Sequence, residues 1–171
     1  PNGVNLELFT PIERNEAKRR LGWDLESRYL LFVSFYDRDR PAKRYWLFKE
    51  VLKILQNRYG HRDLKEFCMV DEPRERVPLI FNACELHLLV SSNEGSPNSI
   101  KEALACNTPV VATDVGSVSH LLEGVPECRV ASSDNPEEIA EAVHAVLGEK
   151  RSDLRHYLVK KGLDRRSVAS Q

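Results

Sequence analysis

The chain has no apolar run of the ~18 residues that a membrane-spanning helix requires, and its first residues show no signal-peptide pattern. We therefore expect no integral membrane span and a cytoplasmic protein, with peripheral attachment to a membrane left open for a longer form of it. An excess of one charge is also missing, because the formal net charge is −1. Such a chain has no overall field to attract nucleic acid or an anionic surface, so no nucleic-acid partner is expected.

Cysteine is sparse, with four residues in mostly apolar surroundings and no C-x-x-C pair. The chain therefore offers no zinc or disulfide framework and favours buried thiols in a reducing compartment. Its five histidines are scattered without the spacing of metal ligands, and no metal site is expected. His87 alternates with Leu86 and Leu88, which predicts a packed or edge histidine of a strand.

What the chain does contain is a regular alternation of short apolar segments and longer amphipathic ones. The predicted strands cover residues 29–34, 64–70, 86–90, 109–113 and 129–131. The predicted helices cover residues 41–56, 97–106, 118–123, 136–147 and 152–161, with a short helix within 73–84. This order predicts right-handed crossovers and a parallel sheet covered on both faces. We expect one α/β domain over residues 1–171, with a doubly wound, Rossmann-like sheet.

Two of these helices carry more detailed predictions. The helix at 41–56 is expected to bury one apolar stripe, formed by Trp46, Leu47, Val51, Leu52 and Leu55. The helix at 136–147 has a clear start, because Asp134 or Asn135 can cap it and Pro136 suits its first position.

The segment from Glu94 to Glu102 lies between two predicted strands and carries the most informative pattern. Gly95 frees the backbone at the turn, and Pro97 suits the first position of the next helix, where no N–H is needed. The following amides lack intrahelical partners and form a positive pole that suits a phosphate or sugar oxygen. Glu94 and Glu102 are expected to face one pocket and to accept hydrogen bonds from hydroxyls. The alternative is an ordinary strand–loop–helix with two solvated glutamates.

Ligands of doubly wound sheets bind beyond the carboxyl ends of the strands. Loops follow the predicted strands at that edge, at residues 37–43, 71–73, 94–98 and 114–116. The sequence therefore predicts that these loops converge on one binding rim.

The block E-G-S-P-N-S-I-K-E-A-L-A-C-N-T-P-V-V-A-T-D-V-G, at residues 94–116, resembles the donor-site signature of the family-four retaining glycosyltransferases of GT-B fold. Residues 1–11 are similar to the connection into that family's C-terminal domain, residues 77–85 to its helix before the third strand, and residues 167–169 to the start of its closing helix. The resemblance implies the donor-binding half of a two-domain enzyme. Both ends of the chain look cut, so we expect a fragment whose N-terminal acceptor domain is absent.

The resemblance implies transfer of a sugar from a nucleotide-diphosphate sugar to an acceptor, with retention and without a metal or other cofactor. In that mechanism Glu94 bonds the donor sugar hydroxyls, Lys43 neutralises the diphosphate and Glu102 binds the ribose hydroxyls. The other donor-binding positions are Gly95, Ser96, Pro97, Asn98, Ser99 and Gly116. The expected partners are the donor and the missing domain, and the isolated fragment is expected to lack transferase activity.

One position departs from the family pattern. The family's Gly-Arg after the first strand is replaced here by Val33-Ser34-Phe35. Either Arg38 or Arg40, in the same loop, could supply a guanidinium for bidentate phosphate contact. The residues leave this choice open.

Two other classes remain as alternatives. An epimerase or phosphorylase of the same fold would need its own acids and bases or a Schiff-base lysine, and no motif here supplies them. A non-enzymatic α/β ligand-binding module, such as a receiver, needs an acidic pocket at the end of a central strand, where Val90-Ser91-Ser92-Asn93 stands. The sequence does not assign the sugar, the base, the acceptor or the oligomeric state.

Overall fold

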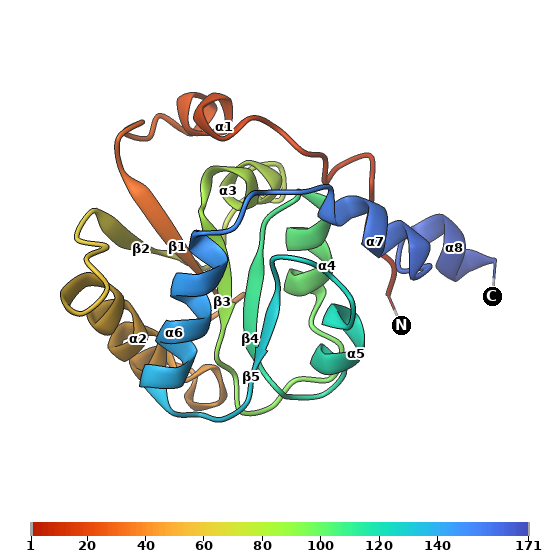
Figure 1. Cartoon of the computed structure of the whole chain (residues 1–171). Coiled ribbons are helices and arrows are strands. Elements are labelled where there is room, and N and C mark those ends of the chain that lie inside the picture. The colour runs from red at the N-terminus through yellow and green to blue at the C-terminus, as the bar shows by residue number, and fades with distance from the viewer. Residues whose placement is uncertain (1, 171) are drawn as a thin grey trace.

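The computed structural model describes residues 2–170. Five parallel strands form one sheet in the order β2-β1-β3-β4-β5, with helices on both of its faces (Figure 1). The strands are β1 (Arg28–Val33), β2 (Leu64–Met69), β3 (Leu86–Leu89), β4 (Val110–Thr113) and β5 (Arg129–Ala131). The predicted strands agree with these bounds to within one residue, and the predicted doubly wound α/β fold is confirmed.

Successive side chains of the strands point to opposite faces of the sheet, so the domain has two cores. Leu30 and Phe32 pack on the face covered by α2 and α6, whereas Leu31 and Val33 pack on the face covered by α3, α4, α5 and α7 (Figure 1). These helices are α2 (Tyr45–Asn57), α3 (Val77–Ala83), α4 (Asn98–Ala105), α5 (Val118–Leu122), α6 (Pro136–Leu147) and α7 (Leu154–Lys160).

The prediction of one continuous helix over residues 41–56 is wrong for residues 41–44. A 3-10 turn, η1 (Pro41–Lys43), is separated from α2 by Arg44, whose φ of 51° lies in the left-handed region. The resulting change of direction leaves Trp46 62% exposed, so its predicted place in the apolar stripe is also wrong. Phe48 is buried in the stripe instead.

The starts of two other helices follow their sequences closely. The Asn135 side chain accepts a hydrogen bond from the amide of Glu137, and Pro136 occupies the first turn of α6, as predicted. In α4 the proline lies one position earlier than expected, because Pro97 caps the helix and Asn98 is its first residue.

Helix α1 (Arg14–Leu21) was not predicted, and α8 (Arg165–Ala169) closes the described chain. Five of the eight residues of α1 are charged, four as Arg or Lys and one as Glu, and its apolar residues are limited to Ala17 and Leu21. No 3.6-residue apolar stripe is therefore visible. The helix is held by its packing against α3 and ends at Gly22, whose φ is 71°.

The path of the chain places a topological switch point between β1 and β3. The chain leaves β1 for β2 on one side, and then returns to β3 on the other side. Sheets of this order bind ligands at the carboxyl ends of the two strands that flank the switch. Here the loops at that point are residues 34–44 and 90–97.

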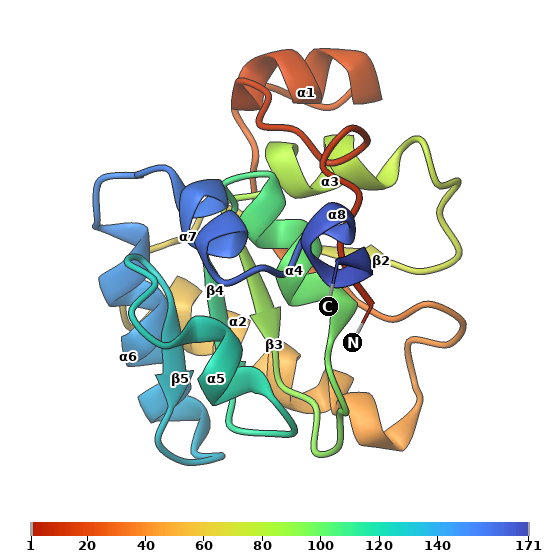
Figure 2. The same cartoon turned by 90° about the vertical axis from the view of Figure 1, so that its right-hand side faces the viewer.

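The two ends of the described chain lie side by side (Figure 2), where Val4 pairs with Asp164 in an isolated parallel bridge. Cys84, Cys106 and Cys128 are buried free thiols, as predicted, whereas Cys68 is only partly buried. Within residues 2–170, no helix combines the length and apolar character needed to span a membrane. The same residues contain no group of three or more His, Cys, Asp or Glu side chains arranged to hold a metal ion.

Candidate functional site

Three of the four loops predicted to converge at the carboxyl edge of the sheet are joined to one another. Lys43 Nζ lies 2.5 Å from Oε1 of Glu94, and the amide of Ser92 donates to the carbonyl of Ala42 at 2.8 Å. The amide of Ser117 donates to the carbonyl of Gly95 at 3.0 Å. The loops after β1, β3 and β4 therefore form one rim.

The ion pair between Lys43 and Glu94 is largely shielded, since the two side chains are 17% and 16% exposed. The Ser91 hydroxyl also donates to Oε1 of Glu94, at 2.7 Å. Both bonds use the same carboxylate oxygen, and Oε2 accepts no hydrogen bond within residues 2–170. The pair sits at the switch point, where a ligand would meet one fixed cation and one fixed carboxylate.

Arg44 was missed by the sequence reasoning, and it connects three loops. Its Nε donates to the carbonyl of Val90 at 2.6 Å, and its Nη2 donates to the carbonyl of Ser91 at 3.2 Å. The guanidinium also pairs with Asp134 at 2.6 Å, which lowers the pKa of that carboxyl. The direction of the Arg44 side chain depends on its left-handed backbone, with a φ of 51°. The sequence does not reveal that conformation, so nothing in it distinguishes Arg44 from the neighbouring basic residues.

The two arginines proposed for phosphate contact lie in the loop after β1. Arg38 is exposed, pairs with Asp39 at 3.5 Å and places its guanidinium 4.9 Å from the centre of the Tyr45 ring. Arg40 precedes η1 and is exposed, and it forms no ion pair within residues 2–170. Neither guanidinium bonds to Glu94, so the choice between them stays a prediction.

The backbone of the Glu94–Gly95 turn packs closely against Gly116. Gly116 has a φ of 55°, and a Cβ atom there would overlap the carbonyl oxygens of Glu94 and Gly95. The structure therefore gives Gly116 a packing role beneath the predicted donor loop. Gly95 differs, because a Cβ on it would meet no protein atom within 4 Å. The surrounding protein therefore leaves room for a larger side chain at position 95. A glycine would be needed there only if a ligand approached the backbone closely.

Helix α4 presents its amino terminus at the same rim. Asn98 and Ser99 are its first residues, and their amides have no intrahelical carbonyl available. Pro97 is buried and Ser96 is exposed. The hydroxyl of Ser99 is directed inward, where its oxygen lies 3.1 Å from Nε2 of His87. Only the backbone of Ser99 is therefore directed toward the rim.

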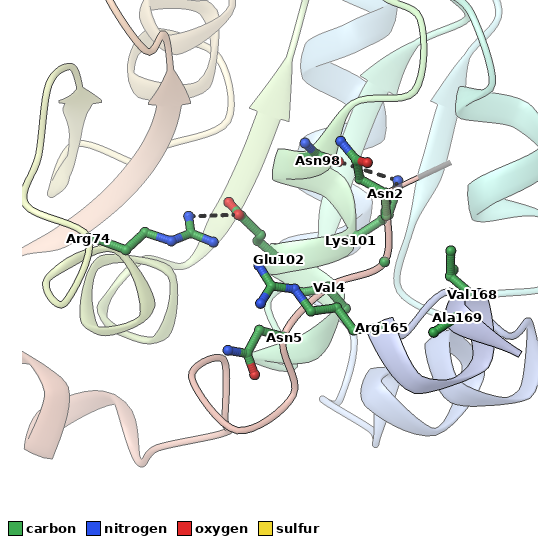
Figure 3. A pocket seen from close by; sticks show the side chains of 11 residues that line it. Asn2, Val4, Asn5, Arg74, Asn98, Lys101, Glu102, Arg165, Val168 and Ala169 are labelled. Atoms are coloured by element: carbon green, nitrogen blue, oxygen red, sulfur yellow. Dashed lines mark hydrogen bonds and ion pairs between the residues drawn. The ribbon is translucent and has the colours of Figure 1, made fainter.

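Glu102 lines a cavity of about 640 Å³ further along α4. Its Oε1 accepts a hydrogen bond from Arg74 at 3.0 Å, but its Oε2 is buried without a partner. Figure 3 shows Arg74 reaching this carboxylate from the segment before α3. Burial raises the pKa of the Glu102 carboxyl, and Arg74 opposes that shift. A buried carboxylate oxygen with no partner is a costly arrangement that points to a ligand.

The rest of this cavity carries positive charge beside the apolar side chains of Val4, Val168 and Ala169. Lys101 donates to the carbonyl of Asn2 at 2.7 Å and to Oδ1 of Asn98 at 3.3 Å. Burial lowers the pKa of the Lys101 ammonium. Arg165 of α8 also lines the cavity (Figure 3). The asparagine amides, the Glu102 carboxylate, which can accept hydrogen bonds from hydroxyls, and the cations together suit a polyhydroxylated, anionic ligand.

The expectation that Glu94 and Glu102 face one pocket is not met by these contacts. Glu94 pairs with Lys43, Glu102 pairs with Arg74, and only Glu102 lines the cavity of Figure 3. Glu94 lies in the loop before α4 and Glu102 lies inside the helix, so the two side chains do not share one helical face. The two acids instead belong to two neighbouring sites, one in the loop before α4 and one inside the helix. The sequence did not predict Arg74 as the partner of Glu102.

The profile of the family described as "Glycosyl transferases group 1" matches residues 52–149. A D-inositol 3-phosphate glycosyltransferase of Geodermatophilus obscurus is 31% identical over 184 residues, which cover 88% of this chain and 40% of that protein. The chain thus spans about 40% of the length of the curated relatives it matches.

Solved structures show the same fold. Anabaena HepE, solved in complex with UDP and glucose, has a TM-score of 0.67 at 15% identity, covering 99% of this chain and 54% of its own. The C-terminal domain of the group 1 glycosyl transferase LpcC from Francisella tularensis has a TM-score of 0.69 at 16% identity, covering 99% of this chain and 98% of its own. More than half of the chain matches the family profile, and the chain therefore belongs to the glycosyl transferases group 1 family.

Proposed function

We propose that the chain is the donor-binding domain of a glycosyltransferase that uses a nucleotide-diphosphate sugar and retains the anomeric configuration. The observation that carries the proposal is Oε2 of Glu102, which is buried without a partner at a cavity beside the amino-terminal turn of α4. A pair of ribose hydroxyls would satisfy this oxygen. The complex of HepE with UDP and glucose supports the assignment by likeness of fold.

The proposed donor lies along the rim from Glu102 to Glu94. Its diphosphate meets the amides of Asn98 and Ser99, which open α4. Lys43 adds an ammonium from the loop after β1, held in place by Glu94. The hydroxyls of the sugar bond to Glu94, whose Oε2 accepts no bond within residues 2–170.

The chemistry asked of these groups is stabilisation of charge. As the glycosidic bond breaks, negative charge accumulates on the departing nucleoside diphosphate and positive charge on the sugar ring. Fixed amides and the Lys43 ammonium are already directed at the phosphates, so little reorganisation is needed. Glu94 holds the sugar in this proposal: its Oε1 is engaged by Lys43 and Ser91, and its Oε2 accepts from the sugar hydroxyls.

The proposal assigns residues 1–171 to one nucleotide-sugar-binding domain of a longer, cytoplasmic protein. Its acceptor groups belong to a further domain, in keeping with the share of the relatives' length that the chain spans. The isolated chain is accordingly expected to bind donor weakly and to transfer no sugar. The LpcC domain, solved alone, supports independent folding of such a unit by likeness of fold.

A titration of Glu102→Gln with nucleotides tests the proposal. We expect UDP, GDP or ADP to shift amide signals of the ¹⁵N-labelled wild-type chain at millimolar concentration. Glu102→Gln should weaken that binding by about tenfold, since it removes a charged acceptor. Glu141→Gln, at an exposed position of α6, is the matched control and should bind as the wild type does. Equal binding by both variants contradicts the role of Glu102.

A further inference from the structure

His87 is a buried polar group that the proposed mechanism does not use. It lies in β3, the central strand of the sheet, with a side chain that is 1% exposed. Its Nδ1 lies 3.3 Å from the carbonyl oxygen of Leu31 in β1, and its Nε2 lies 3.1 Å from Oγ of Ser99 in α4. The ring therefore connects the two strands at the switch point to the first turn of the helix above them.

These contacts determine which ring nitrogen carries the proton. A carbonyl oxygen can only accept, so Nδ1 must donate to Leu31. Nε2 of a neutral ring is then an acceptor, and the Ser99 hydroxyl must donate its proton to it. The hydroxyl proton of Ser99 is thus unavailable to a ligand, and its rotamer is set by the strand beneath it.

The ring also lies within reach of the ion pair at the rim. The pKa of His87 is lowered to about 4, chiefly by burial; the hydrogen bond with the Leu31 carbonyl opposes this shift, the Lys43 ammonium adds to it, and the Glu94 carboxylate opposes it. His87 is therefore neutral at physiological pH, as the tautomer assignment requires. The contact with Ser99 places the ring beneath the first turn of α4, whose amides belong to the proposed donor site.

Resting on the proposed function, we infer that His87 is a positioning residue for the donor. Its Nε2 holds Ser99, and Ser99 in turn orients the amides of Asn98 and Ser99 toward the diphosphate. His87 itself touches no part of the donor. Its contribution should therefore appear in the binding of phosphates and not in the binding of the nucleoside.

Three variants test this role. His87→Leu removes both ring contacts, and Ser99→Ala removes the hydroxyl while keeping its amide. His87→Gln replaces the acceptor at the far end of the side chain and serves as the rescue. His156→Leu, at an exposed histidine of α7, is the control. Dispersed amide spectra establish which variants are folded, and a long-range ¹H–¹⁵N spectrum of the wild type reports the His87 tautomer.

Affinities for the best-binding diphosphate among UDP, GDP and ADP are then compared with those for its nucleoside. We expect His87→Leu and Ser99→Ala each to weaken diphosphate binding about fivefold to tenfold, with nucleoside binding changed less than about twofold. The double variant should be no weaker than either single variant, because the two residues act through one contact. His87→Gln should recover most of the loss, and the wild-type ring should carry its proton on Nδ1.

Equal losses for diphosphate and nucleoside, additive effects in the double variant, or a ring protonated on Nε2 would each overturn the positioning role. If His87→Leu does not fold, Ser99→Ala and the tautomer still decide the question. Binding of no diphosphate by the wild-type chain is a different result, since it removes the donor site itself and the positioning role with it.

Discussion

Lys43 and Glu94 are 51 positions apart in the sequence, and their side chains meet at 2.5 Å above the switch point of the sheet. The contact joins the loop after β1 to the loop after β3. It places the cation proposed for the diphosphate beside the carboxylate proposed for the sugar. The pair therefore combines two roles in one contact, and each partner holds the other in position before a donor binds.

Replacement of Lys43 by methionine should weaken diphosphate binding by about tenfold or more, because a charged donor is lost from a partly shielded site. The stability of the fold should fall by about 1–3 kcal/mol, more than for an exposed pair, because Glu94 is left without its cation in a largely shielded site. Isothermal titration with UDP and GDP measures the first quantity, and denaturant unfolding measures the second.

The matched control is Lys49→Met, which removes the same charge from an exposed position of α2. Unchanged diphosphate binding by Lys43→Met, or an equal loss in both variants, would contradict the role of Lys43. Equal losses would indicate that only the overall charge of the domain matters.

Gly116→Ala should destabilise the fold by about 3 kcal/mol or more. The new Cβ would overlap the carbonyl oxygens beneath the Glu94–Gly95 turn, in addition to the strain of a left-handed φ. Gly124→Ala is the control, because its φ of 70° is also left-handed but its Cβ would meet nothing within 4 Å. That variant should lose only about 1–2 kcal/mol. If chemical denaturation gave equal losses in the free energy of unfolding for the two variants, the close packing at Gly116 would contribute nothing to stability.

The three inner strands β1, β3 and β4 could be predicted from the sequence because each is a short, mainly apolar run, as in residues 86–90, and such runs are typical of buried parallel strands. The edge strand β2 gives a weaker signal, because Lys65 and Glu66 interrupt it. The start of α6 was equally readable from Asn135 and Pro136. Helix α1 could not be found in this way. Its stability comes from packing against α3 rather than from an apolar stripe of its own.

The candidate site was only partly predictable for the same physical reason. The motif at 94–102 identified the loop and helix, but the partners of its acids come from distant segments. Arg74 meets Glu102 through the turn after β2, and Arg44 reaches the rim only because its backbone is left-handed. His87 was correctly predicted to be packed, yet its contact with Ser99 depends on how α4 lies on the sheet. Such relationships belong to tertiary packing and leave no local pattern.

Glu102 should make stability fall as the pH rises. Burial holds the pKa of the folded carboxyl above its ordinary value of 4.5, so the folded state ionises at higher pH than the unfolded state. The penalty is absent below pH 4.5 and complete once the pH exceeds the folded pKa. Glu102→Gln should therefore be stabilised relative to the wild type at pH 7 more than at pH 4. Urea unfolding at the two pH values measures this difference, and its absence would show that Arg74 fully compensates the buried charge.

His87 should act in the opposite direction. Its folded pKa of about 4 lies below the ordinary value of 6.5, so the unfolded chain binds a proton that the folded chain refuses. Stability from this group is complete above pH 6.5 and is lost as the pH falls toward 4, to a total of roughly 3 kcal/mol. His87→Gln should flatten the loss of stability between these limits. An identical slope in variant and wild type would mean that the ring is protonated in the folded state.

The most direct test of the account is a titration of the ¹⁵N-labelled chain with UDP, GDP and ADP, followed by amide chemical shifts. The account predicts that at least one diphosphate moves the signals of Gly95, Asn98, Ser99 and Glu102, while those of the distant helix α1 stay in place. It also predicts that the corresponding nucleoside moves Glu102 but leaves Gly95 unchanged. Failure of all three diphosphates to shift any of these signals at millimolar concentration, or shifts confined to another face, would contradict the assignment of a donor site to this rim.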